Sequence, residues 1–178
     1  MPRAPQSLKA RALGLIAQRE YSPVELRRKL RAQAMRQRRA AERTPLASQA
    51  ADTDADEAAT ATTGVTVPTA QELDELLDWL VAKDLLNTAR FVEARVNLRA
   101  QRHGNLRIRH ELAQHGVEID PDKAAALERS ELARAQSVWS KRFGERAADA
   151  AGRAKQMRFL AARGFSADVV RRVVAGRE

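Results

Sequence analysis

The sequence predicts an all-α protein of three tandem three-helix repeats, which form an elongated, curved array with a disordered insertion in the first repeat. The first observation is a pattern that occurs three times: a leucine, three further residues, a small residue and an apolar residue. The copies are Leu30–Met35, Leu112–Val117 and Leu160–Phe165. The second observation is the composition, because 44% of the residues are hydrophobic but only 4% are aromatic, which favours alanine-rich helices over strands. Three similar corners in one chain indicate repeated helical units, each too small to bury a core alone.

The small residue of this pattern explains why a helix should end there. Gly116 and Gly164 have no Cβ, so each can adopt the left-handed conformation that terminates a helix. The next residue then packs back on the leucine, as Phe165 is expected to do on Leu160. The first copy has Ala34 in the glycine position, and the pattern predicts a corner there as well.

The N-terminal part of the chain contains two predicted helices. Apolar residues recur at helical spacing over residues 7–20, which indicates the first. The second begins at Ser22, an N-cap that forms a predicted capping box with Glu25. This helix runs toward Met35 and has no clear stop signal before Arg43.

An acidic segment interrupts the first repeat. Residues 44–68 are rich in Ala, Thr and Asp and have no apolar periodicity, so they are not expected to form a core. Together with the end of the preceding helix they define a predicted disordered insertion over residues 36–68. Order resumes at Thr69, which forms a predicted capping box with Glu72 and is followed by leucines at strict helical spacing. The first repeat therefore spans residues 1–86.

Six further helices are expected in the rest of the chain. Asn87, Asp120 and Ser166 are predicted N-caps, Gly104 lies in a predicted turn, and Gly144 breaks a helix. The expected helices are, in order, 88–101, one that carries Ile108 and Leu112, 121–129, one from Leu132 to Phe143, 154–163, and one over Val169–Val174. The second repeat spans residues 87–130 and the third 131–178, which makes nine helices in three sets of three.

Charge is distributed unevenly along this chain of net charge +9. Residues 1–43 contain 12 Lys and Arg against 3 Asp and Glu, residues 44–86 contain 1 against 9, and residues 87–178 contain 19 against 11. Two basic flanks around an acidic middle indicate an anionic partner, either nucleic acid or an acidic protein. The alternative is that these are ordinary solvated helix faces.

The sequence also suggests a compartment. It has no cysteine, which suits a reducing cytosol. No apolar run approaches the ~20 residues that a membrane helix needs, and the N-terminus lacks a signal-peptide core. We therefore expect a cytoplasmic protein without a membrane partner, and we expect it to be a monomer.

Candidate catalytic and metal sites are poorly supported. His110 and His115 resemble the histidine pair of a zinc-protease helix, but they are five residues apart. That spacing separates them by about 140° around a helix, so they do not face one ion. Phosphate-cradling loops are missing because the glycines are isolated at helix ends. We expect no catalytic residues, no metal and no cofactor, and hence a protein that is not an enzyme.

Basic side chains near the predicted corners are the remaining candidates for a binding surface. If the repeats stack in one sense, these residues line one side of the array, where guanidinium groups suit phosphates and carboxylates. The alternative is that individual arginines satisfy helix C-termini and neighbouring glutamates. Trp139 and Phe143 lie on an apolar face and are more typical of a core than of base stacking. The candidate residues are Arg27, Arg28, Lys29, Arg31, Arg107, Arg109, Arg153, Lys155, Arg158, Arg163, Arg171 and Arg172.

Several segments resemble one known family, and they occur in that family's order. They are Ser7–Leu30, Leu86–Phe91, Ile108–Leu112 with Gly116-Val117, Lys141–Phe143 and Arg158–Val170. The chain resembles the RecX regulatory proteins over nearly all of its length outside residues 36–68. The first repeat departs from the family, since Ala34-Met35 and the insertion stand where a Gly-Phe-type corner usually joins its second and third helices.

The resemblance implies a function that the residues alone do not. Members of this family are bacterial proteins of three tandem three-helix repeats that bind the RecA recombinase filament. They modulate, mainly by inhibition, its ATPase, recombinase and coprotease activities. The expected partners are therefore the RecA filament and, more weakly and with salt dependence, single- or double-stranded DNA. The alternative is a helical module that binds DNA directly and has no RecA-specific role.

Overall fold

The computed structural model describes residues 7–43 and 67–176 of the chain, and within these ranges it contains eight α-helices and no β-strand. The predicted all-α class is confirmed. The chain divides into two compact units, a first unit of residues 1–86 and a second unit of residues 87–178. Within the described ranges, no helix combines the length and the apolar character required to cross a membrane.

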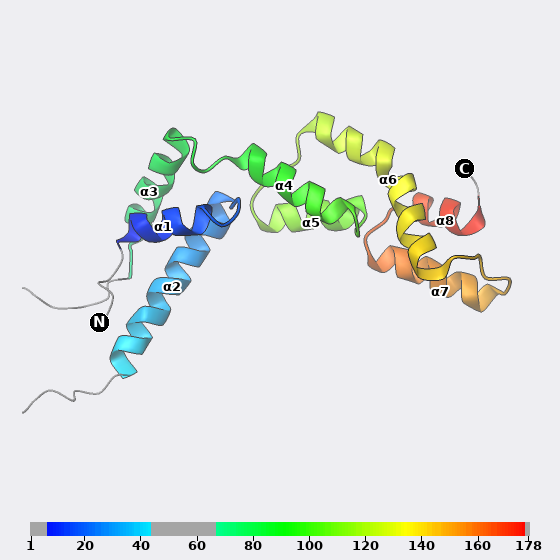
Figure 1. Ribbon diagram of the computed structural model, residues 1–178, viewed down its shortest axis with the longest axis horizontal. Helices are drawn as coiled ribbons and strands as arrows, with labels where there is room; N and C mark the ends of the chain where they lie inside the picture. Colours follow the sequence, from blue (N-terminus) through cyan, green and yellow to red (C-terminus); the bar gives the residue numbers. More distant parts are fainter. Residues whose placement is uncertain (1–6, 44–66, 177–178) are drawn as a thin grey trace, which may run out of the picture. The chain divides into compact units, whose positions relative to one another are not determined.

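The first unit contains α1 (Leu8–Ile16), α2 (Pro23–Arg43) and α3 (Ala70–Ala82), drawn in blue to green in Figure 1. Their apolar faces meet in one core, in which Ala12, Leu26 and Leu30 are fully buried. Leucines from α3 complete this core, as their helical spacing predicted. The further members of this core are Leu15, Tyr21, Leu73, Leu77, Leu80 and Leu86.

Each helix of the first unit is capped at its N-terminus by a side chain that lies next to its own first turn. The hydroxyl of Ser22 accepts a hydrogen bond from the backbone N–H of Glu25 at 3.1 Å. At the start of α3, the Thr69 hydroxyl accepts from the Glu72 N–H, and the Glu72 carboxylate accepts from the Thr69 N–H. The predicted capping box of Thr69 and Glu72 is confirmed. Each such cap contributes about 1 kcal/mol to helix stability.

The corner predicted at Ala34 is wrong. Helix α2 continues without a break to Arg43, and Ala34 is fully buried in the middle of it. Alanine is the best helix former and its Cβ opposes the left-handed conformation, so nothing in the local sequence stops the helix. Residues 36–43 of the predicted insertion are therefore helical. The rest of that insertion, up to residue 66, lies outside the described residues.

The second unit contains five helices, drawn in green to red in Figure 1. They are α4 (Thr88–Ala100), α5 (Asn105–Gln114), α6 (Pro121–Phe143), α7 (Ala150–Ala162) and α8 (Ala167–Ala175). One core lies between α4, α5 and the first part of α6, and includes Phe91, Ile108 and Leu127. A second core lies between the later part of α6, α7 and α8, and includes Ala135 and Leu160.

Helix α6 is one helix where the sequence predicted two. The prediction placed a boundary between Arg129 and Leu132, but α6 runs from Pro121 to Phe143. Ser130 was the only residue there able to cap a new helix, and its hydroxyl instead donates to the Leu127 carbonyl oxygen within the same helix. The continuous α6 supplies side chains to both cores of the second unit.

The glycine corners are confirmed. Gly116 and Gly164 have φ of 67° and 79°, the left-handed conformation that glycine favours. The N–H after each glycine donates back to the leucine carbonyl, from Val117 to Leu112 at 3.1 Å and from Phe165 to Leu160 at 3.4 Å. These bonds define the helix-ending motif that the sequence pattern predicted.

A third copy of this motif lies at Leu80–Leu85 rather than at Ala34. Asp84 has φ of 52°, and the Leu85 N–H donates to the Leu80 carbonyl oxygen at 2.9 Å. The spacing from leucine to left-handed residue is the same as at the two glycine corners. Aspartate tolerates the left-handed conformation better than most residues with a Cβ, which explains a corner without glycine.

Candidate functional site

Two chain segments of the second unit are joined through their backbones. The N–H of Gly104, between α4 and α5, donates to the Arg163 carbonyl oxygen at 3.0 Å. The N–H of Leu106 donates to the Gly164 carbonyl oxygen at 3.1 Å. A Cβ on Gly104 would overlap the Gly164 carbonyl oxygen and the Phe165 backbone, so this close approach requires glycine. We call this contact the junction; it connects the α4–α5 turn to the α7–α8 corner.

A buried carboxylate from α6 supports both sides of the junction. The side chain of Glu131 is almost completely buried, and its Oε1 accepts from the backbone N–H of Asn105 at 2.8 Å and of Ser166 at 3.4 Å. These two N–H groups lie at the starts of α5 and α8. Ser166 was correctly predicted as the N-cap of the last helix, but its own side chain makes no capping hydrogen bond. Glu131 satisfies that helix end instead.

Arg134, one turn later on α6, binds the carbonyl groups around the same turn. Its guanidinium donates to the carbonyl oxygens of His103 at 2.8 Å, Ala100 at 3.3 Å and Leu127 at 3.0 Å. It also donates to Asn105 Oδ1 at 2.6 Å. Burial lowers the pKa of Arg134, and the nearby Glu131 carboxylate opposes that shift. The junction is therefore held by two backbone hydrogen bonds and by two polar side chains of α6.

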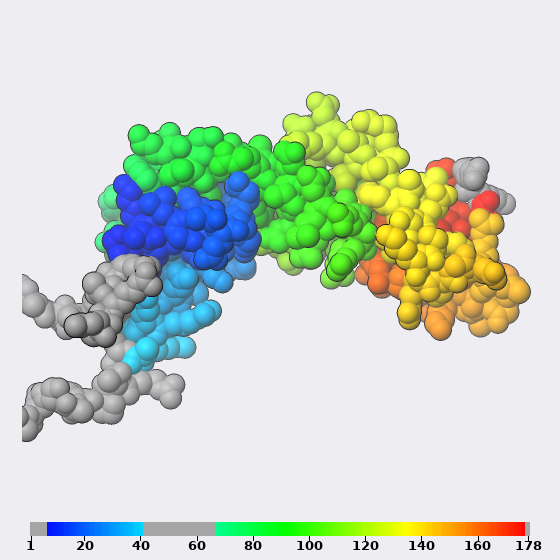
Figure 2. Space-filling view, in the orientation of Figure 1, coloured from blue at the N-terminus to red at the C-terminus, as the bar shows by residue number. Residues whose placement is uncertain are grey.

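A hollow of about 730 Å³ lies beside the junction, and we call it the basic groove. It is bordered by the end of α4 and the start of α5, by the later part of α6, and by the end of α7. Figure 2 shows these parts of the second unit packed against one another, in green, yellow and orange. The groove is lined by Gln101, Arg102, His103, Arg107, Val138, Lys141, Arg142, Phe159, Ala162 and Arg163.

The charge of the basic groove is of one sign. Five of its lining residues are Lys or Arg, and among the described residues no Asp or Glu lines it. The pKa of His103 is lowered, first by burial and then by the positive charges of Arg107, Arg99 and Arg163. The contribution of these three arginines to the lowered pKa is the effect expected of a positive potential at the groove.

Two of the predicted site residues lie in the groove in defined positions. The guanidinium of Arg163 stacks on the ring of Phe159, with its central carbon 3.8 Å from the ring centroid. The Phe159 ring also contacts Phe143 edge to face, with ring centroids 5.0 Å apart. Arg107 donates to the carbonyl oxygen of Ala162 at 3.4 Å. Arg107 and Arg163 are 56 positions apart in sequence and are brought together by the junction.

Other predicted site residues make structural contacts. Arg27 is paired with Asp74 of α3, and Arg109 with Glu128 of α6. Arg153 donates to the carbonyl oxygen of Ala148 at 2.5 Å, at the start of its own helix. For these arginines the structure favours the alternative that the sequence left open, a role in satisfying neighbouring groups.

The remaining predicted residues are exposed or line two further hollows. Arg28, Lys29, Arg31, Lys155 and Arg158 are exposed on α2 and α7. Arg153, Arg171 and Arg172 border a hollow of about 410 Å³, together with Asp168, whose carboxylate lies 3.5 Å from the Arg171 guanidinium.

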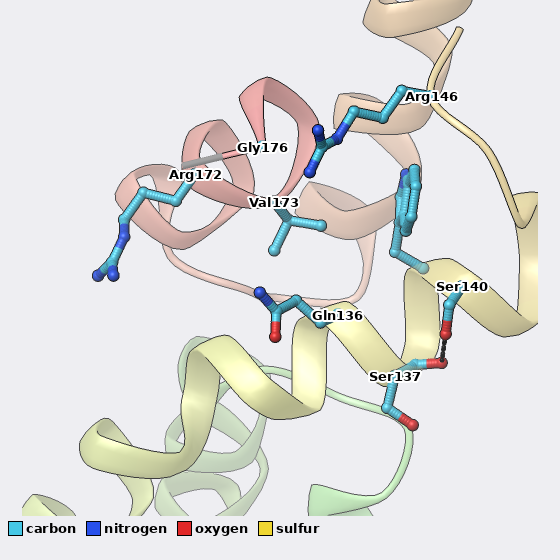
Figure 3. Close-up of a pocket in the computed structure, with 8 residues that line it drawn as sticks. Gln136, Ser137, Ser140, Arg146, Arg172, Val173 and Gly176 are labelled. Atoms are coloured by element: carbon cyan, nitrogen blue, oxygen red, sulfur yellow. Dashed lines mark hydrogen bonds between the residues drawn. The ribbon is translucent and has the colours of Figure 1, made fainter. Parts of the chain in front are cut away.

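The third hollow, of about 720 Å³, lies between α6 and α8 and is shown in Figure 3. Arg146 lies against Gly176 at one side of it, whereas the side chain of Arg172 extends away from Gln136 and Val173. The indole N–H of Trp139, which also lines this hollow, is buried and has no hydrogen-bond partner among the described residues. The Trp139 ring packs against the core beneath α8, as expected for a core residue.

The histidines lie in unrelated environments. His115 packs edge to face on Phe91, and His110 Nε2 lies 2.9 Å from Gln114 Nε2. Among the described residues, no group of three or more His, Cys, Asp or Glu side chains is arranged to hold a metal ion.

The basic groove contains three cationic residues that sequence analysis did not single out, Arg102, Lys141 and Arg142. They were missed because candidates were grouped by predicted helix, whereas the groove combines side chains from three helices. Lys141 and Arg142 lie in the last turn of α6, and from the sequence they were named only within the segment Lys141–Phe143 that resembles the family. An arginine, a histidine and a glycine in succession at a turn were the signal for Arg102 and His103.

Comparison with known proteins identifies the family. Residues 87–120 match the second three-helix domain of RecX and residues 129–174 match its third three-helix domain. The chain is 42% identical to the regulatory protein RecX of Ralstonia pickettii, over 99% of this chain and 91% of that protein. It is 33% identical to the regulatory protein RecX of Pseudomonas entomophila, over 98% of this chain and 94% of that protein.

A solved structure shows the same fold. The crystal structure of RecX from Lactobacillus salivarius is similar with a TM-score of 0.60, and the match covers 95% of this chain and 93% of that one at 14% sequence identity. With the two matched three-helix domains and the relatives that are 42% and 33% identical, these findings establish the classification. The chain belongs to the RecX family of regulatory proteins.

Proposed function

We propose that this protein binds the filament that the RecA recombinase forms on DNA and modulates, mainly by inhibition, its ATPase, recombinase and coprotease activities. Membership of a family of regulatory proteins supports the proposal, and the relatives carry that name. A protein that works by binding needs a preformed surface rather than a catalytic constellation. We accordingly propose a cytoplasmic, monomeric protein that is not an enzyme.

The observation that carries the proposal is the basic groove. It presents Arg102, Lys141 and Arg142 on exposed side chains and Arg107 and Arg163 at fixed positions. A filament of protein on DNA is strongly anionic because of its phosphates, so a concentrated positive surface increases the rate and the strength of association.

The first unit supplies a second basic surface, which we call the α2 patch. Arg28, Lys29 and Arg31 are exposed on α2, whereas Leu26 and Leu30 of the same helix are buried in the core. The charged and apolar faces of this helix are therefore separate. Arg27 is not part of the patch, because it is paired with Asp74.

A direct test measures ATP hydrolysis by RecA on single-stranded DNA in the presence of this protein. We expect hydrolysis to fall as the protein is added, and the loss to be nearly complete near stoichiometric amounts. Unchanged hydrolysis and unchanged strand exchange at stoichiometric protein would contradict the proposed function.

The α2 patch can be tested separately. Changing Arg28, Lys29 and Arg31 to Glu should weaken the effect on RecA while leaving the helical content unchanged, because these side chains lie off the apolar face. The matched control changes Arg36, Arg38 and Arg39 to Glu, which alters the net charge equally on the same helix. Equal effects of the two triple variants would assign the loss to overall charge rather than to the patch.

A second candidate function, direct DNA binding without a RecA-specific role, is favoured by the one-signed charge of the basic groove. It predicts that the protein affects other enzymes acting on single-stranded DNA as strongly as RecA. Measuring inhibition of an unrelated DNA-dependent ATPase beside RecA distinguishes the two, because only a RecA-specific regulator should leave the unrelated enzyme active.

A further inference from the structure

We infer that the basic groove of the second unit binds the sugar–phosphate backbone of nucleic acid and does not read its bases. This inference rests on the proposed function, because it names which component of a nucleoprotein filament the groove contacts. It assigns the contact to side chains of the α4–α5 turn, the end of α6 and the end of α7. The residues are Arg102, Arg107, Lys141, Arg142 and Arg163, with His103 between them.

Charge is the first argument. Five cationic side chains surround a hollow of about 730 Å³, and no described Asp or Glu lines it. Arg102, Lys141 and Arg142 have no ion-pair partner among the described residues, whereas Arg99, just outside the groove, is paired with Glu111 at 2.8 Å. Uncompensated like charges repel one another, so such a cluster is stabilised when a polyanion enters it. Duplex DNA is such a polyanion, because it carries one negative charge per about 1.7 Å of its axis.

Rigidity is the second argument. The α4–α5 turn and the α7–α8 corner are connected through backbone hydrogen bonds from Gly104 and Leu106. Glu131 and Arg134 form hydrogen bonds with six polar atoms in and around the junction, five of the backbone and one of the Asn105 side chain. Cations on a fixed frame lose less conformational freedom on binding than the same cations on a mobile loop. The backbone of the α4–α5 turn and of the α7–α8 corner is therefore held in place before a ligand binds.

The aromatic residues decide between the backbone and the bases of nucleic acid. Base recognition without hydrogen-bond readout requires an open aromatic face. In the groove one face of Phe159 is occupied by the Arg163 guanidinium, and the ring also forms a T-shaped contact with Phe143 and packs against the core. Trp139, on the adjoining turns of α6, packs against the core beneath α8. The groove thus offers guanidinium and ammonium groups, which match phosphate oxygens.

The same residues argue against an acidic protein segment as the ligand. Protein interfaces are centred on buried apolar or aromatic anchors and are depleted in lysine. Val138 and Ala162 are the aliphatic residues of the lining, and Phe159, its aromatic residue, is stacked with Arg163. Charge without such anchors is typical of a phosphate-binding surface.

The test compares two double variants of the full-length protein. In the first, Lys141 and Arg142 are both changed to Glu; both side chains are exposed at the end of α6. In the matched control, Lys123 and Arg129 are both changed to Glu; they are exposed on the same helix but do not line the groove. The two variants have the same net charge, and circular dichroism checks that both retain the helical content of the wild type.

Binding is measured by fluorescence anisotropy with labelled oligothymidylate, with a labelled mixed-sequence single strand and with a labelled duplex, each over a range of salt concentrations. We expect the groove variant to bind at least about tenfold more weakly than the control. Its logarithmic salt dependence on the duplex should be shallower by about 2, since two phosphate contacts are lost. The two single strands should bind wild type equally, because the groove does not read bases.

Three outcomes would overturn the inference. The groove variant binds nucleic acid as well as the control, wild type prefers one single strand strongly over the other, or the salt dependence is unchanged. If the groove variant loses its effect on RecA yet binds free DNA normally, the groove contacts acidic protein rather than phosphate. That result would contradict this inference and leave the proposed function intact. If instead the wild-type protein binds DNA but does not affect RecA, the proposed function is contradicted and this inference stands.

Discussion

The start of α3 in the first unit and the start of α8 in the second unit differ in where they find hydrogen-bond partners. In the first unit, α3 begins with a capping box made by Thr69 and Glu72, three residues apart. In the second unit, the start of α8 is satisfied by Glu131, 35 residues earlier on α6, and not by Ser166. The first arrangement is a local property of the sequence, whereas the second exists only after α6 has packed against α8.

The corners provide a second comparison, between two copies of one sequence pattern. Leu160–Phe165 and Leu30–Met35 share one pattern of apolar residues, but only the first is a corner. Gly164 ends α7, and Ala34 lies in the interior of α2. The apolar pattern is thus insufficient, and the residue in the left-handed position decides the outcome together with the contacts that the corner makes.

The largest expected effect is that of Gly164→Val. A β-branched residue at φ of 79° is strained, and even its Cβ would lie 2.6 Å from the backbone nitrogen of Arg107. Strain and overlap together should destabilise the protein by about 4 kcal/mol. Urea unfolding measures the change, with Gly116→Val as the comparison at the other glycine corner. If Gly164→Val unfolds at the wild-type urea concentration, the importance assigned to the corner is wrong.

Glu131→Ala should have the next largest effect. It leaves the N–H groups of Asn105 and Ser166 and the nearby guanidinium of Arg134 without a buried carboxylate, and we expect a loss of about 3 kcal/mol. Ser166→Ala should change stability by less than about 0.5 kcal/mol, because its side chain makes no capping bond. Thermal and urea unfolding of the two variants test whether α8 is capped from a distance. A larger loss for Ser166→Ala than for Glu131→Ala would show that the cap is local.

Ala34→Gly gives the first unit the same residue as the two glycine corners. Because Ala34 lies inside a helix, we expect α2 to persist and the protein to lose about 1 kcal/mol, the usual cost of glycine in a helix interior. The matched control is Gly14→Ala in α1, where a Cβ meets no atom within 4 Å and should stabilise. Circular dichroism and urea unfolding provide the measurement. A large drop in helical signal for Ala34→Gly would show that the pattern can still form a corner there.

Most of the fold could be predicted because its signals are local. The capping residues Ser22, Thr69 and Asn87 and the corner glycines each act within a few residues, so reading the chain in order located them. Helix α6 was divided wrongly because the sequence near Ser130 is ambiguous. The two halves of α6 pack into two different cores, and this tertiary packing keeps the helix continuous. A local sequence pattern does not contain that information.

The candidate site could be predicted only in part. Arg107 and Arg163 were recognised as basic residues at corners, but their proximity depends on the close approach of Gly104 to the α7–α8 corner. Gly104 was read as a turn residue, and nothing in the sequence indicates what its backbone touches. Arg102 and Lys141 join the groove for the same tertiary reason. The sequence therefore predicted that basic residues form the site, but it did not predict which of them lie together in the groove.

The smallest expected effect is a dependence of stability on pH that comes from the local cap of α3. Hydrogen bonds from the backbone and then the hydroxyl of Thr69 lower the pKa of Glu72 below its ordinary value. Because the folded pKa is below the unfolded one, the charged carboxylate stabilises the folded state above the unfolded pKa of about 4.3. That contribution is lost as the pH falls through the folded pKa.

Glu72→Gln should therefore be less stable than wild type near neutral pH, and the difference should shrink as the solution is acidified below about pH 4. Other carboxylates titrate in the same range, so the informative quantity is the difference in urea unfolding between the two proteins at each pH. Glu75→Gln is the matched control, since Glu75 lies on the same helix and, among the described residues, its carboxylate accepts from the exposed Gln71 side chain at 2.9 Å and from no backbone N–H. A difference between wild type and Glu72→Gln that stays constant from neutral to acidic pH would mean that the charge of Glu72 does not stabilise the start of α3.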